Sequence, residues 1–380
     1  MSINVRRAAV FAALVLPLGA FAQETIVKIG HVAPTSGSIA HLGKDNEMSA
    51  RMAIEDLNAK GLMIGGRKVT FALLAEDDGA DPKQATAVAQ KLVDSGVNGV
   101  VGHLNSGTSI PASRIYSDAG IAQISPAATN PKFTRQGYKT TFRVVADDVQ
   151  LGGALGRYAV NTLNSTAVAV IDDRTAYGQG VAQEFEKGVI SAGGKVVARQ
   201  FTTDKATDFT SILTAIKANK PDLIFFGGMD AVAGPMIRQM RQLGIDARFV
   251  GGDGLCTSDL PKLAAGAIVD GKVFCAEAGG VEGEQKKGMD DFRMAFKKKY
   301  GVEVKLYAPY VYDAVGLLAA AMVKAGSADP VNYIPALAAT EGYKGVTGLI
   351  SFDPKGDIKN ASLTLFTYRS GVREQIAVIR

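Results

Sequence analysis

Strand and helix patterns alternate along most of this chain, and the alternation constrains its fold more than any other feature. The first strand pattern, Ile26–Val32, is followed by a helix pattern with Ala53, Ile54 and Leu57 on one face. Further strands are predicted at Val69–Ala75, Gly99–Leu104, Ala122–Ser125, Ala167–Asp172, Lys195–Gln200, Leu223–Gly227 and Arg248–Gly251. Several are continuous apolar runs, which are typical of parallel strands covered by helices on both faces. The chain is therefore predicted to be an α/β protein.

The alternation of strands and helices begins again midway along the chain. It predicts two doubly wound α/β lobes joined by a three-segment hinge. The last third has too few elements for a third lobe. We expect a helix near Tyr310–Lys324 and a strand near Leu349–Phe352 to return to the first lobe, and the final strands to join the second. The predicted crossings are near Ala146–Gln150, Ala276–Gly280 and Asp353–Gly356. The N-terminal lobe is then residues 23–147 plus 278–354, and the C-terminal lobe residues 148–277 plus 355–380. Ligands of open α/β sheets bind beyond the carboxyl ends of the strands, so the cleft between the lobes is the expected site.

Residues 1–22 have the pattern of a secretory signal peptide. The pair Arg6 and Arg7 precedes an apolar run that ends at Leu18, and an Ala-Phe-Ala cleavage site ends at Ala22. No other stretch has the ~20 uninterrupted apolar residues that span a bilayer. We expect a periplasmic protein that begins at Gln23.

Charge and cysteine content indicate which partners and which cross-link to expect. The sequence has 42 Lys and Arg against 37 Asp and Glu, a mild balance that predicts no nucleic-acid partner. Lys297–Lys299 is interpreted as a solvated helix face. Cys256 and Cys275 flank one predicted helix, and an exported chain allows them to form a disulfide. Two buried free thiols are the alternative.

The sequence offers no constellation for catalysis. Its histidines, His31, His41 and His103, lack metal-ligand spacing, and we interpret His31 and His103 as packed or hydrogen-bonded side chains. Gly178-Gln-Gly180 resembles the start of a dinucleotide fingerprint, but Gln183 stands where the third glycine belongs. We therefore predict no enzyme, no cofactor and no metal.

Two loops that follow predicted strands favour ligand binding. The segment 102–109 joins a strand to a helix, and its Ser106 and Thr108 hydroxyls and exposed N–H groups suit a carboxylate at the helix N-terminus. The loop Ser125–Pro131 brings Thr129 to the same edge. The alternatives are simple helix capping by Ser106 and Thr108, and an ordinary proline-rich turn.

The chain resembles the leucine/isoleucine/valine-binding proteins, periplasmic receptors of branched-chain amino acid importers with the type I periplasmic binding protein, or Venus-flytrap, fold. The resemblance covers nearly the whole chain after residue 22. It is carried by Gly30–Gly37, Asp77–Ala87, Gly102–Ser106, Ser125–Pro131, Tyr177–Gly180 and Asp353–Asp357.

This resemblance implies a set of ligand contacts. Ser106 and Thr129 are expected to bind the α-carboxylate of an amino acid, and the carbonyl of Ala127 to accept from its ammonium group. Tyr177 would cover the ligand, and Asp253 would pair with the ammonium. A zwitterion in a closed cleft needs partners of both signs, because an unpaired buried charge is costly. A helix-capping Tyr177 and a turn-forming Asp253 are the alternatives.

The sequence departs from the family where the ligand's side chain is expected. Leu42 and Met229 stand where aromatic residues are common, and Asp253 replaces the usual glutamate. Tyr307 retains an aromatic wall, and Ala128 belongs to the first-lobe binding loop. Leu42 and Met229 leave an apolar, pliable space. A branched-chain amino acid is the first expectation, and a larger apolar or aromatic amino acid is the alternative.

The resemblance also implies a mechanism and partners. The ligand docks on the first lobe, hinge closure adds the second, and the closed form is recognised by an inner-membrane ABC permease whose ATPase subunits are separate. We expect a monomer. Competing interpretations are a sensory ligand-binding domain, an enzyme on this scaffold, and a receptor for amides, urea or aromatic acids. A ligand without an ammonium group would leave Asp253 unpaired.

Overall fold

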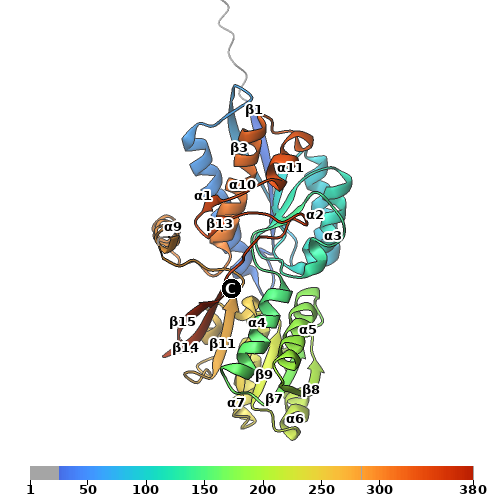
Figure 1. Ribbon diagram of the computed structural model, residues 1–380, viewed down its shortest axis with the longest axis vertical. Coiled ribbons are helices and arrows are strands. Elements are labelled where there is room, and N and C mark those ends of the chain that lie inside the picture. Colours follow the sequence, from blue (N-terminus) through green and yellow to red (C-terminus); the bar gives the residue numbers. More distant parts are fainter. Residues whose placement is uncertain (1–24, 284, 380) are drawn as a thin grey trace, which may run out of the picture.

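The computed structural model describes residues 25–283 and 285–379 and has two α/β lobes stacked along its long axis (Figure 1). The predicted signal peptide and the expected mature terminus at Gln23 lie outside these residues. The first lobe carries a sheet with the strand order β2-β3-β1-β4-β5-β6, and the second a sheet with the order β15-β14-β11-β10-β9-β7-β8. The predicted two-lobed α/β fold is confirmed.

The first sheet is parallel except at one edge. Strand β1 pairs in parallel with β3 and β4, β5 pairs in parallel with β4 and β6, and β2 is antiparallel to β3. Its strands are β1 Thr25–Ala33, β2 Met63–Ile64, β3 Arg67–Asp77, β4 Gly99–Gly102, β5 Gln123–Ser125 and β6 Thr141–Arg143. The helices of this lobe are α1 Ala40–Lys60, α2 Pro82–Asp94, α3 Ser106–Asp118, α9 Gln285–Tyr300, α10 Ala308–Ala325 and α11 Pro330–Ala338.

Local sequence signals set the helix boundaries of this lobe. Asp81 caps α2 by accepting from the N–H groups of Lys83 and Gln84 at 2.8 and 3.0 Å, with Pro82 in the first turn. Gly61 ends α1 in the left-handed conformation, with φ of 61°. Both boundaries confirm the predictions from sequence.

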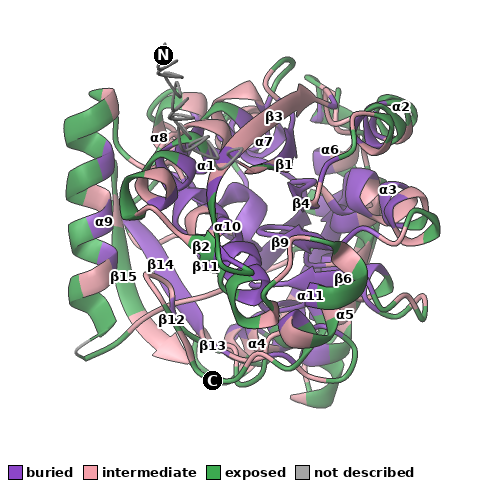
Figure 2. Cartoon of the chain, turned by 90° about the horizontal axis from the view of Figure 1, so that it is seen from above, coloured by how far each residue is buried: buried purple, intermediate pink, exposed green. Residues whose placement is uncertain are grey.

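The inner strands of the second sheet are buried on both faces. In β9, Phe225 and Phe226 point to opposite sides and belong to different hydrophobic clusters. The strands are β7 Ala167–Asp172, β8 Lys195–Phe201, β9 Leu223–Gly227, β10 Arg248–Gly251, β11 Val273–Glu277, β14 Leu363–Arg369 and β15 Val372–Ile379. The helices are α4 Asp148–Asn161, α5 Ala176–Ser191, α6 Thr210–Ala218, α7 Asp230–Gln242 and α8 Leu260–Leu263. Figure 2 shows the buried strands enclosed by helices whose outer faces are exposed.

The last third of the chain serves both lobes. Helix α10 packs against α1, β4 and β5 of the first lobe. Strand β13, Gly348–Ile350, pairs with β12, Tyr343–Gly345, as a separate antiparallel hairpin and does not extend the first sheet. The reason is local: the Asp313 carboxylate on α10 accepts from the N–H groups of Val346 and Thr347, both at 2.8 Å, and holds the hairpin turn on that helix.

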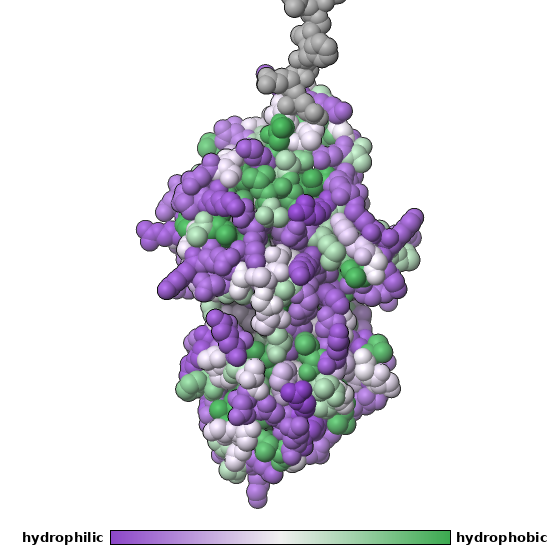
Figure 3. All heavy atoms as spheres, turned by 180° about the vertical axis from the view of Figure 1, so that it is seen from behind, coloured by the Kyte–Doolittle hydropathy of each residue, from purple (hydrophilic) through white to green (hydrophobic). Residues whose placement is uncertain are grey.

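The chain segments that cross between the lobes lie side by side at the waist, which Figure 3 shows as a narrowing of the molecule. The N–H of Ala146 donates to the carbonyl of Ala278 at 2.8 Å, and the N–H of Arg143 donates to that of Gly356 at 2.9 Å. Within the described residues, no single helix is long and apolar enough to cross a membrane. The pair α10 and α11 meets the length and composition test only jointly, across a bend of 110°.

Candidate ligand-binding site

Loops from the carboxyl ends of both sheets meet between the lobes. Strands β4 and β5 lead into Ser106 and Ala127 on the first-lobe side. Strands β7, β9 and β10 lead into Tyr177, Met229 and Asp253 on the second-lobe side. This is the edge at which open parallel sheets bind ligands, and the repeated β-α pattern predicted it.

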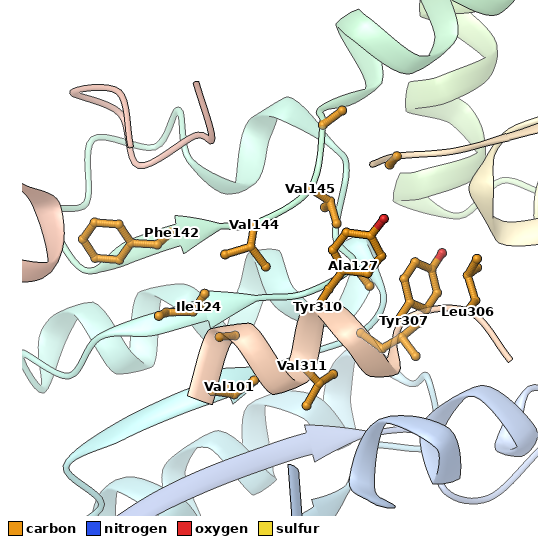
Figure 4. Packing of buried hydrophobic residues seen from close by; sticks show 14 of the residues in the cluster. Val101, Ile124, Ala127, Phe142, Val144, Val145, Leu306, Tyr307, Tyr310 and Val311 are labelled. Carbon is orange, nitrogen blue, oxygen red and sulfur yellow. The ribbon is translucent and has the colours of Figure 1, made fainter. Parts of the chain in front are cut away.

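A small central cavity of about 10 Å³ lies where these loops meet. Its wall is formed by Leu104, Asn105, Ser106, Ala127, Tyr177, Met229 and Tyr307. A cavity of this size holds about one water molecule. Hydrogen bonds from Tyr307 to Asp253 at 2.9 Å and from Asn130 to the carbonyl of Ala176 at 2.7 Å join the lobes, so the conformation is closed. Tyr307 precedes α10, and Figure 4 shows its ring and hydroxyl beside Leu306, directed away from the packed Val101 and Val311.

Asp253 is the acidic centre of the site. Its carboxylate accepts a hydrogen bond from the Tyr177 hydroxyl at 2.8 Å and another from the Tyr307 hydroxyl at 2.9 Å. The Tyr177 oxygen in turn accepts from the N–H of Gly254 at 2.9 Å. Tyr307 belongs to the first lobe and Asp253 to the second, so this contact joins the lobes. The arrangement leaves a buried carboxylate beside the cavity with fixed donors at its flanks.

Burial sets the protonation behaviour of this centre. It raises the pKa of Asp253 to about 6, although the two tyrosine hydrogen bonds oppose the shift. Burial, together with the neighbouring Asp253 charge, raises the pKa of Tyr177 and Tyr307 well above their usual range. The tyrosines therefore remain hydrogen-bond donors near neutral pH, and Asp253 is their acceptor.

The opposite wall of the cavity carries donors. Ser106 starts α3, and its hydroxyl oxygen accepts from the N–H of Asn130 at 3.2 Å. Asn105, at the N-cap position, makes no capping hydrogen bond with its side chain. The start of α3 thus presents N–H groups and a hydroxyl to the cavity, which suits an anion.

Three predicted site residues lie away from the cavity wall. Leu42 is fully buried in the hydrophobic core. The carbonyl of Ala128 accepts from the Arg143 guanidinium at 2.9 Å. Thr129 is buried, and its carbonyl accepts from the N–H of Asp148 at 2.8 Å. In this closed conformation, these residues support the binding loop.

Arg143 organises that loop and was not predicted. It is fully buried, and its Nε donates to Asp357 at 2.7 Å while its Nη1 donates to the carbonyls of Ala128 and Asn130. The only sequence signal was the segment Asp353–Asp357, which carried the family resemblance without an assigned role. Asp357 therefore connects the third crossing segment to the first-lobe binding loop.

The Gly178-Gln-Gly180 motif is a packing device. A Cβ at Gly178 would lie 2.5 Å from the carbonyl oxygen of Gly227. A Cβ at Gly180 would lie 2.5 Å from both Asn130 Nδ2 and Asp148 Oδ2. The same Asn130 amide donates to the carbonyl of Ala176 at 2.7 Å, from the first lobe to the second. These glycines allow α5 to approach β9 and the opposite lobe.

A groove of about 740 Å³ leads from the surface toward the central cavity. The two spaces share Asn105, Tyr177 and Met229 in their walls. Farther out, the groove is lined by polar loops from both lobes, including Ser36 and Thr175. The groove and the cavity therefore adjoin each other at these three residues.

The histidines have the packed roles predicted for two of them. His31 Nδ1 lies 3.0 Å from the carbonyl of Val101, and burial lowers its pKa to about 4. His103 lies 2.7 Å from the Asp78 carboxylate. Across residues 25–283 and 285–379, no group of three or more His, Cys, Asp or Glu side chains is arranged to hold a metal ion.

The cysteine pair lies beside the acidic centre. Cys256 and Cys275 form a disulfide, which confirms the pairing expected from the sequence. It links the segment after β10, which carries Asp253, to strand β11. Arg373 donates to the carbonyl of Cys256, and the Tyr368 hydroxyl donates to that of Thr257 at 2.8 Å. The segment that presents Asp253 is therefore fixed at several points.

Comparison with known proteins identifies the family of this chain. Residues 26–372 match the family model of periplasmic binding proteins. The chain is 36% identical over 345 residues to Leu/Ile/Val-binding protein homolog 1 of Brucella abortus, which covers 91% of each chain. It is 34% identical over 342 residues, or 90% of each chain, to a leucine-, isoleucine-, valine-, threonine- and alanine-binding protein of Pseudomonas aeruginosa.

A solved structure agrees with this result. The crystal structure of a leucine-binding protein from Thermotoga maritima superposes with a TM-score of 0.84 at 27% identity, covering 93% of this chain and 99% of that one. The family match, the relatives and the two-lobed architecture are consistent with one another. This chain belongs to the periplasmic binding protein family.

Proposed function

We propose that this chain is the substrate-binding component of an ABC importer and that it captures a branched-chain or other apolar amino acid. One observation carries the proposal: the buried Asp253 carboxylate, flanked by Tyr177 and Tyr307, lies beside a cavity whose other wall holds Ser106 and the start of α3. An amino acid has an ammonium group for the first and a carboxylate for the second. The names of the relatives support an amino-acid ligand.

Binding proceeds by docking and closure. The ligand first binds the first lobe, with its carboxylate at Ser106 and the loop that contains Ala127, Ala128 and Thr129. Rotation about the crossing segments then brings Tyr177, Met229 and Asp253 over it. Only a ligand that favours the closed state shifts this equilibrium, and the ammonium–Asp253 pair supplies that preference.

The ligand's side chain lies against an apolar wall. Leu104 and Met229 line the cavity, and Leu42 lies in the core of the first lobe. Methionine adapts its shape to different apolar groups. Because the cavity measures only about 10 Å³ in this structure, we infer that Met229 and the facing lobes move apart to admit leucine, isoleucine, valine or a larger apolar side chain.

The lobe limits and partners complete the proposal. We assign residues 23–147 and 278–354 to the N-terminal lobe and residues 148–277 and 355–380 to the C-terminal lobe. The protein acts as a monomer in the periplasm after removal of residues 1–22. The Cys256–Cys275 disulfide supports an oxidising compartment. The closed form delivers its ligand to an inner-membrane permease whose separate subunits hydrolyse ATP.

A thermal-shift screen tests the ligand class. The twenty amino acids are compared with amides, urea and aromatic acids, since a bound ligand raises the melting temperature by linkage. We expect the largest shifts from leucine, isoleucine and valine. Stabilisation by benzoate or an amide, with none by any amino acid, would refute the amino-acid assignment.

A further inference from the structure

A second set of contacts crosses between the lobes beside the central cavity. His41, near the start of α1, places its Nε2 2.8 Å from the Asp230 carboxylate at the first residue of α7. Lys305, in the loop before α10, places its Nζ 3.0 Å from the Asp259 carboxylate. None of these residues belongs to the wall of the cavity or of the groove. We call His41, Lys305, Asp230 and Asp259 the cross-lobe charge strip.

In the strip, each lobe carries charges of one sign. Both cationic side chains, His41 and Lys305, belong to the first lobe, and both acids belong to the second. Asp230 is fully buried, and its carboxylate also accepts from the Thr257 hydroxyl at 2.7 Å. His41 is partly exposed, with 24% of its side chain accessible. Separation of the lobes would therefore return His41 to water and leave Asp230 without its charged partner.

Each side of the strip is rigidly supported. On the first lobe, the buried Asp45 carboxylate on α1 accepts from the N–H of Lys305 at 3.0 Å and from the N–H groups of Leu306 and Ala308 at 3.3 Å. Asp45 lies one helical turn after His41. On the second lobe, the Cys256–Cys275 disulfide fixes the segment that carries Asp259. These contacts fix the backbone from which Lys305 and Asp259 extend, so the two side chains face each other from defined positions.

We propose that the cross-lobe charge strip is a closure latch, meaning a set of contacts that stabilises the closed state. The strip does not contact the bound amino acid, but it sets how long that amino acid is retained. The inference rests on the proposed function, since it assigns these residues to the closure step of the same cleft. Opposite charges on facing surfaces favour the closed state, and partly buried pairs contribute more than exposed ones.

The latch makes retention depend on pH through His41. The groups that act on His41 are Asp230 on α7 and Asp259 before α8, which favour its charged form, and Lys305 before α10, which disfavours it. Burial opposes the charge, but the Asp230 hydrogen bond and charge outweigh it and raise the pKa of His41 above its usual 6.5. Stabilisation of the closed state is therefore complete below the open-state pKa and is lost as the pH rises through the closed-state pKa.

Release kinetics of labelled L-leucine into excess unlabelled leucine test the latch. We expect His41→Gln and Lys305→Met each to raise the dissociation rate roughly three- to fivefold at about pH 6, with little change in the association rate. The matched control is Lys44→Met, which removes an exposed charge from α1. His41→Lys keeps a positive charge at every pH tested, so it should retain slow release as the pH rises above the range in which His41 of the wild type loses its proton.

The outcomes separate the latch from the proposed function. Identical pH profiles for the wild type and His41→Gln, or an equal effect of Lys44→Met, would overturn the latch while leaving amino-acid binding intact. If the wild type binds no amino acid, the proposed function fails, and the latch is judged on the ligand-free protein. Spin labels at Lys83→Cys and Lys187→Cys, exposed on α2 and α5, should then report a longer interlobe distance in His41→Gln. An unchanged distance would also overturn the latch.

Discussion

Replacement of Asp253 by asparagine is the sharpest test of the acidic centre. The amide keeps the size of the carboxylate but removes its charge and one of the two acceptors that Tyr177 and Tyr307 use at 2.8 and 2.9 Å. At neutral pH the carboxylate is ionised, since its pKa is about 6 even with burial. Loss of the charged partner of a desolvated ammonium costs about 3 kcal/mol, or roughly a hundredfold in Kd.

A matched variant, Tyr307→Phe, provides a smaller loss of affinity for comparison. Tyr307→Phe removes one hydrogen bond to the carboxylate and keeps the charge, so its cost is about 1.5 kcal/mol, or roughly tenfold. Isothermal titration calorimetry with L-leucine near neutral pH should therefore rank wild type, Tyr307→Phe and Asp253→Asn in that order of affinity. An Asp253→Asn protein with native melting behaviour and a Kd within about threefold of wild type would refute the ion pair.

Three further predictions follow from the same site. L-leucine affinity should fall as the pH drops below about 6, because a proton on Asp253 removes the partner of the ammonium; calorimetry across this range should show no such decline in Asp253→Asn. Joint replacement of Cys256 and Cys275 by alanine removes a cross-link between positions separated by 19 in sequence. It should lower the free energy of unfolding, measured by urea denaturation, by about 3 kcal/mol, and a loss under about 1 kcal/mol would contradict this prediction. Gly180→Ala should weaken leucine binding more than about tenfold, because its methyl group would lie 2.5 Å from the Asn130 amide across the closed cleft, besides 2.5 Å from Asp148 in its own lobe; Gly288→Ala, in a helix with open space, is the control, and normal affinity in Gly180→Ala would refute the closure argument.

The sequence predicted the fold because its evidence was local. Buried strands such as Leu223–Gly227 are continuous apolar runs, and Asp81 with Pro82 specifies a helix start within a few residues. The location of the site followed from the same pattern, because strands of parallel sheets end at one edge. The resemblance to a known family then singled out Ser106 and Asp253 at that edge.

The contacts missed from sequence are long-range. Arg143 pairs with Asp357 across 214 positions, and His41 with Asp230 across 189. No periodicity or spacing links such residues, and the second pair joins the two lobes across the cleft. Leu42 shows the reverse case: its position in the family pattern suggested a cavity wall, but packing of α1 buries it in the core.

The short side chain of Asp253 matches the close approach of its neighbours. Glycines on both sides of Asp253 let Tyr177 approach it. A Cβ at Gly252 would lie 2.6 Å from the Tyr177 hydroxyl oxygen, and a Cβ at Gly254 would lie 2.8 Å from the Tyr177 ring. Tyr177 can therefore lie directly over the segment and donate to Asp253, while Tyr307 does so from the other lobe. Both donors thus reach the short side chain of Asp253, so the longer side chain of an Asp253→Glu variant should displace a tyrosine rather than improve the pairing.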